Sequence, residues 1–194
     1  MTQNLREAVR EAYGSAATDP AAKHPFPVGR EFALSLGYPS SLLDELPTEC
    51  VEAFTGVSNV SFAAEIAAGS TVLDLGCGAG LDCLVAARKT GPGGKVIGVD
   101  FCAAMLERAR LAAGELGLGQ VEFRQGDAER LPFEDGSFDT AMVNGVFNLN
   151  LARGKMFGEL ARVLHSGGTA WVAELVLRAP PEKESPRTGD DWFA

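Results

Sequence analysis

A dense glycine turn directly follows a short apolar run, and this feature constrains the fold of the chain more than any other. The run and the turn read VLDLGCGAG, residues 72–80, and three of the last five positions are glycine. Because glycine adopts left-handed backbone conformations at no steric cost, the pattern is typical of a buried strand that turns sharply into a helix at a ligand site. Asp74 stands inside this strand, where an anionic ligand would be repelled.

From residue 70 onward, strand-like and helix-like patterns alternate. The apolar runs predict strands over 72–75, 95–100, 121–127, 138–146 and 169–177, and apolar residues at helical spacing predict helices over 81–89, 103–116 and 154–164. Short glycine turns join these segments, the last of them HSGG at 165–168. The alternation predicts an α/β fold, with a doubly wound, mainly parallel sheet covered by helices on both faces.

The first sixty residues are less regular. Apolar residues at helical spacing predict a short helix that ends near Gly14, and three prolines mark residues 18–29 as a loop. A second helical stretch, residues 40–54, is expected to break at Pro47.

Length and charge limit the classes of function. A chain of 194 residues fits one domain, and its net charge of −9 opposes non-specific binding to nucleic acids or to anionic membranes. No apolar run has the length of a membrane span, and the charged beginning of the sequence is unlike a signal peptide. We therefore expect a cytoplasmic protein without nucleic-acid or membrane partners.

The four cysteines, Cys50, Cys77, Cys83 and Cys102, show no metal-binding pattern. They form no CxxC pair and have no histidine at ligand spacing. We expect four reduced thiols and no metal site.

The carboxyl ends of parallel strands meet in one crevice, and three carboxylates fall there. Asp100 ends the second strand, 20 positions after Gly80, which suits the hydroxyls of a ribose and fits a nicotinamide dinucleotide site. Leu81, however, stands where the dinucleotide pattern needs a small residue, and Asp74 and Asp127 make the crevice acidic. A nucleoside without phosphate and with a cationic end suits this crevice better, and S-adenosylmethionine is such a ligand. A nicotinamide dehydrogenase remains the alternative.

Several segments of the chain resemble those of a known family. The segments VLDLGCGAGLD, VIGVD, GDAERLPFEDGSFD and ARVLHSGG resemble those of the class I S-adenosylmethionine-dependent methyltransferases, over roughly residues 66–178. VREAYG at 9–14 and VNGVFNLN at 143–150 resemble the branch near the arsenite methyltransferases, with methyltransferase type 11 or UbiE-like domains. The resemblance implies a Rossmann-like fold, divided into a helical and loop cap (1–60), a methyltransferase core (61–178) and a tail (179–194).

The resemblance also implies which residues hold the cofactor. Asp74 and the glycines would hold the methionine end, with the Asp74 carboxylate facing the ammonium group directly or through water. Asp100 would hold the ribose and Asp127 the adenine amino group. Phe101 and Met105 would pack on the adenine, with ordinary packing at a helix start as the alternative. The complete set of implied cofactor residues is Asp74, Gly76, Gly78, Gly80, Asp100, Phe101, Met105, Asp127, Ala128, Glu129, Asn144 and Gly145.

Methyl transfer from a sulfonium needs alignment and exclusion of water more than it needs a catalytic dyad. The candidates for contact with the reacting groups are few. By resemblance Tyr13 would lie over the methionyl end, with packing of an amphipathic helix on the core as the alternative, and Asn144 would lie beside the reacting methyl group. His24 lies in a proline-rich loop that can fold over the site. His165, in the turn at 165–168, is interpreted as structural.

The methyl acceptor is expected to be a small molecule, and arsenite is disfavoured. The arsenite branch places a cysteine where this chain has Gly145 and a second one near Gly56 and Val57. Three alternatives stay open: a non-catalytic S-adenosylmethionine-binding module, an arsenite methyltransferase-like enzyme and, less favoured, a nucleic-acid methyltransferase. The chain has only 17 residues after Leu177, so the antiparallel strand pair that closes the sheet in relatives is expected to be lacking. An exposed fifth strand would permit either a monomer or a homodimer.

Overall fold

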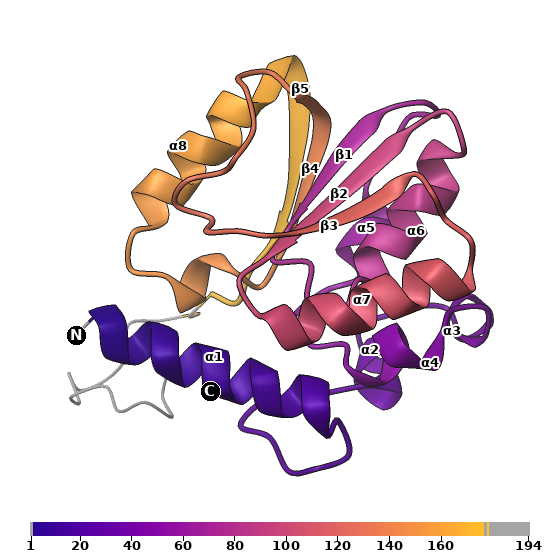
Figure 1. Cartoon of the computed structure of the whole chain (residues 1–194), viewed down its shortest axis with the longest axis vertical. Coiled ribbons are helices and arrows are strands. Elements are labelled where there is room, and N and C mark those ends of the chain that lie inside the picture. The colour runs from indigo at the N-terminus through magenta and orange to yellow at the C-terminus, as the bar shows by residue number, and fades with distance from the viewer. Residues whose placement is uncertain (1, 177, 179–194) are drawn as a thin grey trace.

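The computed structural model of the chain describes residues 2–176 and 178, and its centre is a five-stranded sheet (Figure 1). The strands are β1 (Thr71–Leu75), β2 (Lys95–Asp100), β3 (Val121–Gln125), β4 (Phe138–Asn144) and β5 (Leu164–Ala173). They lie in the order β3-β2-β1-β4-β5, and every neighbouring pair is parallel. The predicted parallel α/β sheet is therefore confirmed, and the strand order reverses between β1 and β4.

Helices cover both faces of this sheet. They are α1 (Thr2–Thr18), α2 (Arg30–Ser35), α3 (Ser40–Asp44), α4 (Thr48–Glu52), α5 (Val60–Ala63), α6 (Leu81–Thr90), α7 (Ala103–Glu115), α8 (Arg153–Val163) and the 3-10 turn η1 (Phe147–Leu149). Figure 1 shows α8 on one face and α6 and α7 on the other. The expected covering of both faces is thus present.

Alternation along β1 divides the core into two layers. Val72 belongs to the cluster under α6 and α7, whereas Leu73 and Leu75 belong to the cluster under α8, which includes Met156 and Leu160. Successive strand residues point to opposite faces, so a strand that is apolar at every position is buried on both sides. This accounts for the almost unbroken apolar run at 72–75.

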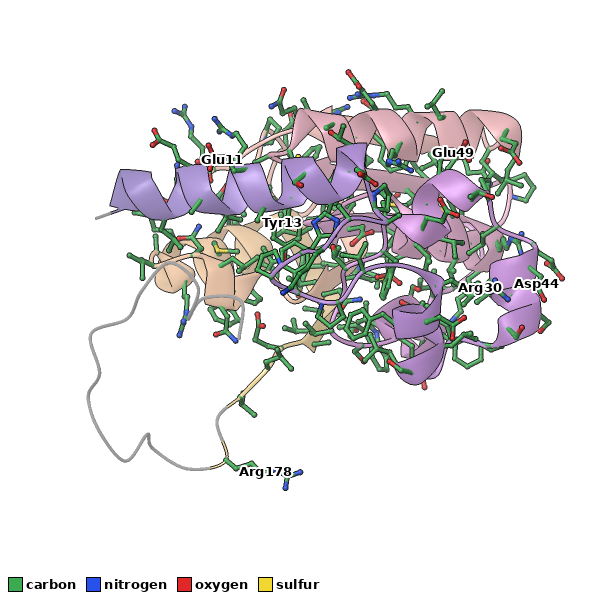
Figure 2. All side chains as sticks on the ribbon, turned by 90° about the horizontal axis from the view of Figure 1, so that it is seen from below. Glu11, Tyr13, Arg30, Asp44, Glu49 and Arg178 are labelled. Carbon is green, nitrogen blue, oxygen red and sulfur yellow. The ribbon has the colours of Figure 1, made fainter. Side chains whose placement is uncertain are left out.

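The residues before β1 form a layer of short helices over α6 and α7. Helices α1 and α4 pack on α7, and α5 packs on α6. The predicted break at Pro47 is present, because α3 ends at Asp44 and α4 begins at Thr48. An ion pair of 2.5 Å between Arg30 and Asp44 joins α2 to α3 (Figure 2).

Several predicted boundaries are corrected. The first helix continues past Gly14 to Thr18, because Ala16 and Ala17 are buried against the core. Helices α2 and α5 were not predicted. The HSGG segment is the first part of β5 rather than a turn before it, and the β4–β5 register shifts between Phe138 and Thr140.

The C-terminal edge of the sheet is β5. Among the described residues β5 pairs with β4 alone. An isolated antiparallel bridge joins Asp127 to Arg130 in the loop after β3, the strand at the opposite edge of the sheet. The expected tail, 179–194, lies outside the described residues. Within the described part of the chain, no helix is both long enough and apolar enough to cross a membrane.

Candidate functional site

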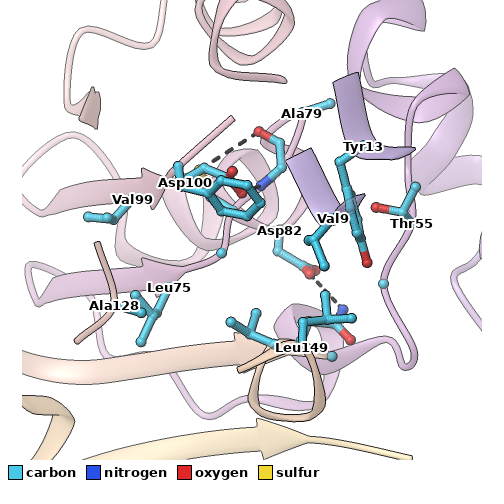
Figure 3. Close-up of a pocket in the computed structure, with 18 of the residues that line it drawn as sticks. Val9, Tyr13, Thr55, Leu75, Ala79, Asp82, Val99, Asp100, Ala128 and Leu149 are labelled. Carbon is cyan, nitrogen blue, oxygen red and sulfur yellow. Dashed lines mark hydrogen bonds between the residues drawn. The ribbon is translucent and has the colours of Figure 1, made fainter. Parts of the chain in front are cut away.

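A cavity of about 430 Å³ opens at the carboxyl ends of the strands, beneath α1 (Figure 3). Its walls come from the turn after β1, the ends of β2 and β4, the loop after β3, and one side of α1. Open parallel sheets bind ligands at this position, where the strand order reverses. The volume lies in the range of small-molecule sites.

Ten of the predicted site residues line this cavity: Tyr13, Gly76, Gly78, Gly80, Asp100, Phe101, Asp127, Ala128, Asn144 and Gly145. Four do not line it: His24, Asp74, Met105 and Glu129.

The glycine turn presents backbone to the cavity because side chains have no room there. Gly76 has a φ of +76°, and a Cβ on it would lie 2.3 Å from Val146. Gly80 has a φ of +87°, and a Cβ on it would lie 2.9 Å from Ala109 of α7. The first glycine therefore permits the close approach of β1 to β4, and the last permits the packing of α6 on α7.

Asp100, at the end of β2, is tied to the glycine turn. One carboxylate oxygen accepts the backbone N–H of Gly78 at 2.9 Å, and the other accepts that of Cys102 at 2.8 Å. Burial raises the pKa of Asp100, while these backbone hydrogen bonds oppose the rise. Each oxygen keeps further acceptor capacity, so the carboxylate can hold the turn and also accept ligand hydroxyls.

Asp74 does not line the cavity, and its expected contact with a ligand stays a prediction. The side chain is 1% exposed, and the thiol of Cys83 donates to it at 3.1 Å. Burial raises its pKa well above the ordinary value, and the charge of Asp82 raises it further. The reason is geometric: Asp74 lies in the middle of the sheet, paired with Gly98 of β2, whereas Asp82 has left the sheet for the first turn of α6.

Asp82 is the carboxylate that lines this part of the cavity. It accepts hydrogen bonds from the hydroxyls of Tyr38 and Ser61 and from the side-chain amide of Asn144 at 2.9 Å. Burial raises the pKa of Asp82, and these hydrogen bonds lower it. Among the described residues, these side-chain donors to Asp82 are all uncharged groups.

The side chain of Asn144 is fully engaged within the protein. Its oxygen accepts the N–H groups of Val57 at 2.8 Å and Ser58 at 3.0 Å. Its nitrogen donates to the Ser58 carbonyl at 2.8 Å and to Asp82 at 2.9 Å. Because an amide has two donors and two acceptor sites, these four bonds use all of them. Asn144 thus ties the loop before α5 to the end of β4.

One side of α1 closes the cavity. Arg6, Val9, Arg10 and Tyr13 line it, and Figure 3 shows Val9 and Tyr13 over the opening. Figure 2 shows Tyr13 on the side of α1 that faces the body of the molecule. These positions follow the helical spacing expected of one face.

Arg6 fastens the beginning of α1 to the loop after β3. Its guanidinium forms ion pairs with Asp127 at 3.1 Å and with Glu129. Glu129 also accepts from Asn150 at 3.1 Å and pairs with Lys155 at 3.8 Å. These partners explain why Glu129 lies at the rim and not, as predicted, in the cavity wall.

Three further predicted residues differ in their surroundings. Tyr13 packs on Phe26 with 4.6 Å between ring centres. Burial raises the pKa of Tyr13, and the charges of Asp100 and Glu174 raise it further, so the phenol stays protonated. His24 stacks on the outer side of Phe26 at 6.3 Å and bonds the Asp19 carbonyl, away from the cavity. The side chain of Met105 is fully buried in the apolar core under α7, which agrees with the alternative of ordinary packing at a helix start.

Beyond the carboxylates, the cavity wall is largely apolar. Phe54, Val146, Leu149 and Met156 line it, with Thr55 as a hydroxyl donor. Such a wall receives an uncharged group more readily than an ion.

The thiols in this wall are neutral. Cys50 and Cys77 line the cavity, and burial raises their pKa to about 12 and about 11. No cysteine is in a disulfide, and no cluster among the described residues has the side chains for a metal ion.

Two glycines at the end of β4 and before α5 lack room for side chains. A Cβ on Gly145, whose φ is +77°, would lie 2.8 Å from Val57, and a Cβ on Gly56 would lie 2.4 Å from the Asn144 amide. These are the positions where the resemblance to the arsenite branch led us to expect cysteines. In this chain the side chain of Val57 occupies the space beside Gly145, and the amide of Asn144 occupies the space beside Gly56.

Sequence reasoning missed Asp82 and the two arginines of α1. The signal for Asp82 was present, since it is a carboxylate in the first turn of the helix that follows the glycines. Arg6 and Arg10 share helical spacing with Tyr13. Tyr38 and Ser61 gave no signal, because only the tertiary fold brings them to Asp82.

The sequence of residues 66–190 matches a family described as a methyltransferase domain. An arsenite methyltransferase of Halobacterium salinarum is 41% identical over 125 residues, which is 64% of this chain and 32% of the relative. A demethylmenaquinone methyltransferase of Lactococcus lactis is 40% identical over 100 residues, which is 52% of this chain and 40% of the relative. The chain thus spans less than half the length of these relatives.

Solved structures show the same similarity. An arsenic(III) S-adenosylmethionine methyltransferase from Chlamydomonas reinhardtii has a TM-score of 0.60 and 38% identity, covering 66% of this chain and 45% of that one. A SAM-dependent methyltransferase from Aquifex aeolicus has a TM-score of 0.55 and 26% identity, covering 63% of this chain and 64% of that one.

Proposed function

The chain belongs to the methyltransferase-domain family, and on that premise we propose that it binds S-adenosylmethionine in the cavity and transfers the methyl group to a small-molecule acceptor. The observation that carries the proposal is the chemistry of the cavity wall. It combines a backbone-lined glycine turn with Asp82, Asp100 and Asp127.

The wall fits the cofactor and disfavours a dinucleotide. A pyrophosphate needs backbone N–H donors and positive charge, yet here the N–H of Gly78 already donates to Asp100 and two buried carboxylates flank the turn. A ligand with a cationic end gains from the same carboxylates. S-adenosylmethionine carries a sulfonium and an ammonium group, so its charge complements the wall.

We assign the parts of the cofactor as follows. Asp100 would accept the ribose hydroxyls, and Asp127 the adenine amino group, with Ala128 and Phe101 beside the ring. Asp82, rather than Asp74, would hold the ammonium group. Gly76, Gly78, Gly80 and the backbone at Gly145 would lie along the methionyl part.

The protein's contribution to the reaction is alignment. The bound cofactor supplies a methyl group already activated by the sulfonium. Helix α1, fastened by Arg6, keeps water out, and the apolar wall at Val146 and Leu149 receives the acceptor. Burial raises the pKa of Tyr13, which keeps its hydroxyl available as a hydrogen-bond donor and opposes a role as a base.

We propose an uncharged, apolar acceptor. No lysine or histidine lines the described cavity, and its arginines lie on α1 toward Phe101 and Asp127. Arsenite is disfavoured, because Gly145 and Gly56 have no room for side chains and the thiols of Cys50 and Cys77 stay neutral.

The cap, residues 1–60, and the core, 61–178, act together in this proposal, since α1 and the loop before α5 complete the cavity. A cytoplasmic monomer or homodimer is the setting we propose, consistent with four free thiols. The main alternative is a module that binds the cofactor without turnover.

A turnover assay separates these two functions. The chain would be incubated with S-adenosylmethionine and a panel of apolar acceptors, and release of S-adenosylhomocysteine would be measured. Acceptor-dependent release supports the enzyme. Release no faster than without acceptor, across the panel, supports the binding module.

A further inference from the structure

Two hydroxyl groups from the N-terminal segment reach the carboxylate of Asp82. Tyr38 lies between α2 and α3, Ser61 lies in α5, and both donate to the same oxygen, Oδ1. Neither residue falls within 66–190, the part of the chain that matches the family. The cavity carboxylate is therefore held by residues outside the matched domain.

Both donors are fixed by burial. Tyr38 is 2% exposed, and its ring packs edge-on against Phe54 at 5.3 Å between ring centres. Ser61 is fully buried in α5, which packs on α6. Side chains held in this way aim their hydroxyls at Asp82 before any ligand arrives, so no ordering is needed on binding.

The charged surroundings of Asp82 oppose its ionisation. Burial raises the pKa of Asp82, and Asp74 of β1, itself a buried carboxylate, interacts with it electrostatically. Cys83, the next residue on α6, contributes a neutral thiol, and Asn144 from β4 contributes a neutral amide. Among the described residues, the anion is stabilised by the two hydroxyls, the amide, the backbone N–H of Ser61 and the first turn of α6.

We propose that Tyr38 and Ser61 are positioning residues that keep Asp82 ionised and aimed into the cavity, so that the N-terminal segment sets the affinity for the cationic end of the cofactor. The inference rests on the proposed function, because it takes Asp82 as the partner of the ammonium group. It goes further by giving residues outside the matched domain a role in cofactor binding.

The sign of the effect follows from the hydrogen bonds. A carboxylate that loses a donor is less stable as an anion, so removing either hydroxyl raises the pKa of Asp82 further. A protonated Asp82 cannot attract the ammonium group. Affinity should fall most at low pH and recover as the pH rises.

The test is a calorimetric titration of the full chain with S-adenosylhomocysteine, which keeps the ammonium group. The wild type, Tyr38→Phe and Ser61→Ala would each be titrated at about pH 5.5 and about pH 7, both below the α-amino pKa of about 7.7–8.0, so that the ligand amine stays largely charged. Ser137→Ala, which removes an exposed hydroxyl bonded to Glu134, is the matched control. Thermal unfolding of each variant would verify folding at both pH values.

We expect each variant to bind about tenfold more weakly than the wild type at the lower pH, as for a lost hydrogen bond to a charged group, and about twofold more weakly at the higher pH. Ser137→Ala should bind like the wild type. If Tyr38→Phe fails to fold, Ser61→Ala carries the test.

Two other results would overturn the inference while leaving the proposed function intact. One is unchanged affinity in folded variants, and the other is an equal loss at both pH values, which would mark a merely structural role. Absence of binding by the wild type would instead remove the proposed function itself.

Discussion

The side-chain amide of Asn144 donates to the carboxylate of Asp82 across 2.9 Å, and this bond joins the end of β4 to the first turn of α6. These two elements lie on either side of the switch in strand order. The same amide holds Val57 and Ser58, so the loop before α5, the sheet and the glycine turn are fixed relative to one another. The cavity is thereby shaped before a ligand enters.

Asn144→Ala should destabilise the protein by about 2–4 kcal/mol, because it leaves the buried Asp82 and the N–H groups of the loop with unmade bonds. Denaturant unfolding monitored by circular dichroism measures this. A loss below about 0.5 kcal/mol, the range of ordinary surface substitutions, would show that the four bonds are replaced by water.

Gly80→Ala should destabilise the fold by about 1–3 kcal/mol, because Gly80 has a φ of +87° and the added Cβ would lie 2.9 Å from Ala109. Thermal unfolding would report the change. Gly158→Ala is the matched control: Gly158 is helical with open space around it, so alanine there should stabilise the protein by about 0.5–1 kcal/mol. Equal effects of the two substitutions would contradict the described turn.

The link between Arg6 and Glu129 should hold α1 closed over the cavity. We expect Arg6→Gln to increase the dissociation rate of S-adenosylhomocysteine several-fold, and added salt to reduce the difference from the wild type, because ion pairs at a rim are screened. Stopped-flow competition experiments measure the rate. Dissociation at the wild-type rate at low salt would show that α1 does not gate the cavity.

The cysteines should be unreactive in the folded state. Burial raises the pKa of Cys50 to about 12 and that of Cys77 to about 11, so almost no thiolate exists near neutral pH. Iodoacetamide followed by mass spectrometry should label none of the four cysteines in the native protein and all four after unfolding. Rapid native labelling of Cys77 would show that the turn opens.

The same shifts imply a dependence of stability on pH. The folded pKa of each thiol lies above the ordinary value of 9.0, so the folded state gains stability that is complete below about pH 9. It is lost as the pH rises toward the folded values. Denaturant unfolding at a series of alkaline pH values should show this decline, and replacing Cys50 by alanine should reduce its slope.

The sequence predicted the sheet and the placement of the candidate site at the carboxyl ends of its strands, because hydrophobic periodicity and glycine spacing are local signals. It placed Asp100 at the end of β2 for the same reason. It did not predict that Asp82, rather than Asp74, lines the cavity, since a position inside a strand does not reveal whether a side chain leaves the sheet toward the cavity. It left open whether Met105 packs in the core, because the rotation of α7 is set by packing.

The roles of Tyr38 and Ser61 could not be predicted. Both come from a segment of short helices whose order in space depends on contacts with α6 and α7. No periodic pattern connects them to Asp82. Long-range hydrogen bonds of this kind are visible only in the folded structure.

The central claim is that the cavity is built for a nucleoside with a cationic end. One calorimetric experiment tests it most directly: titration of the full chain with S-adenosylhomocysteine and, separately, with NAD. We expect saturable binding of one S-adenosylhomocysteine per chain and no measurable binding of NAD. Binding of NAD without binding of S-adenosylhomocysteine would contradict it.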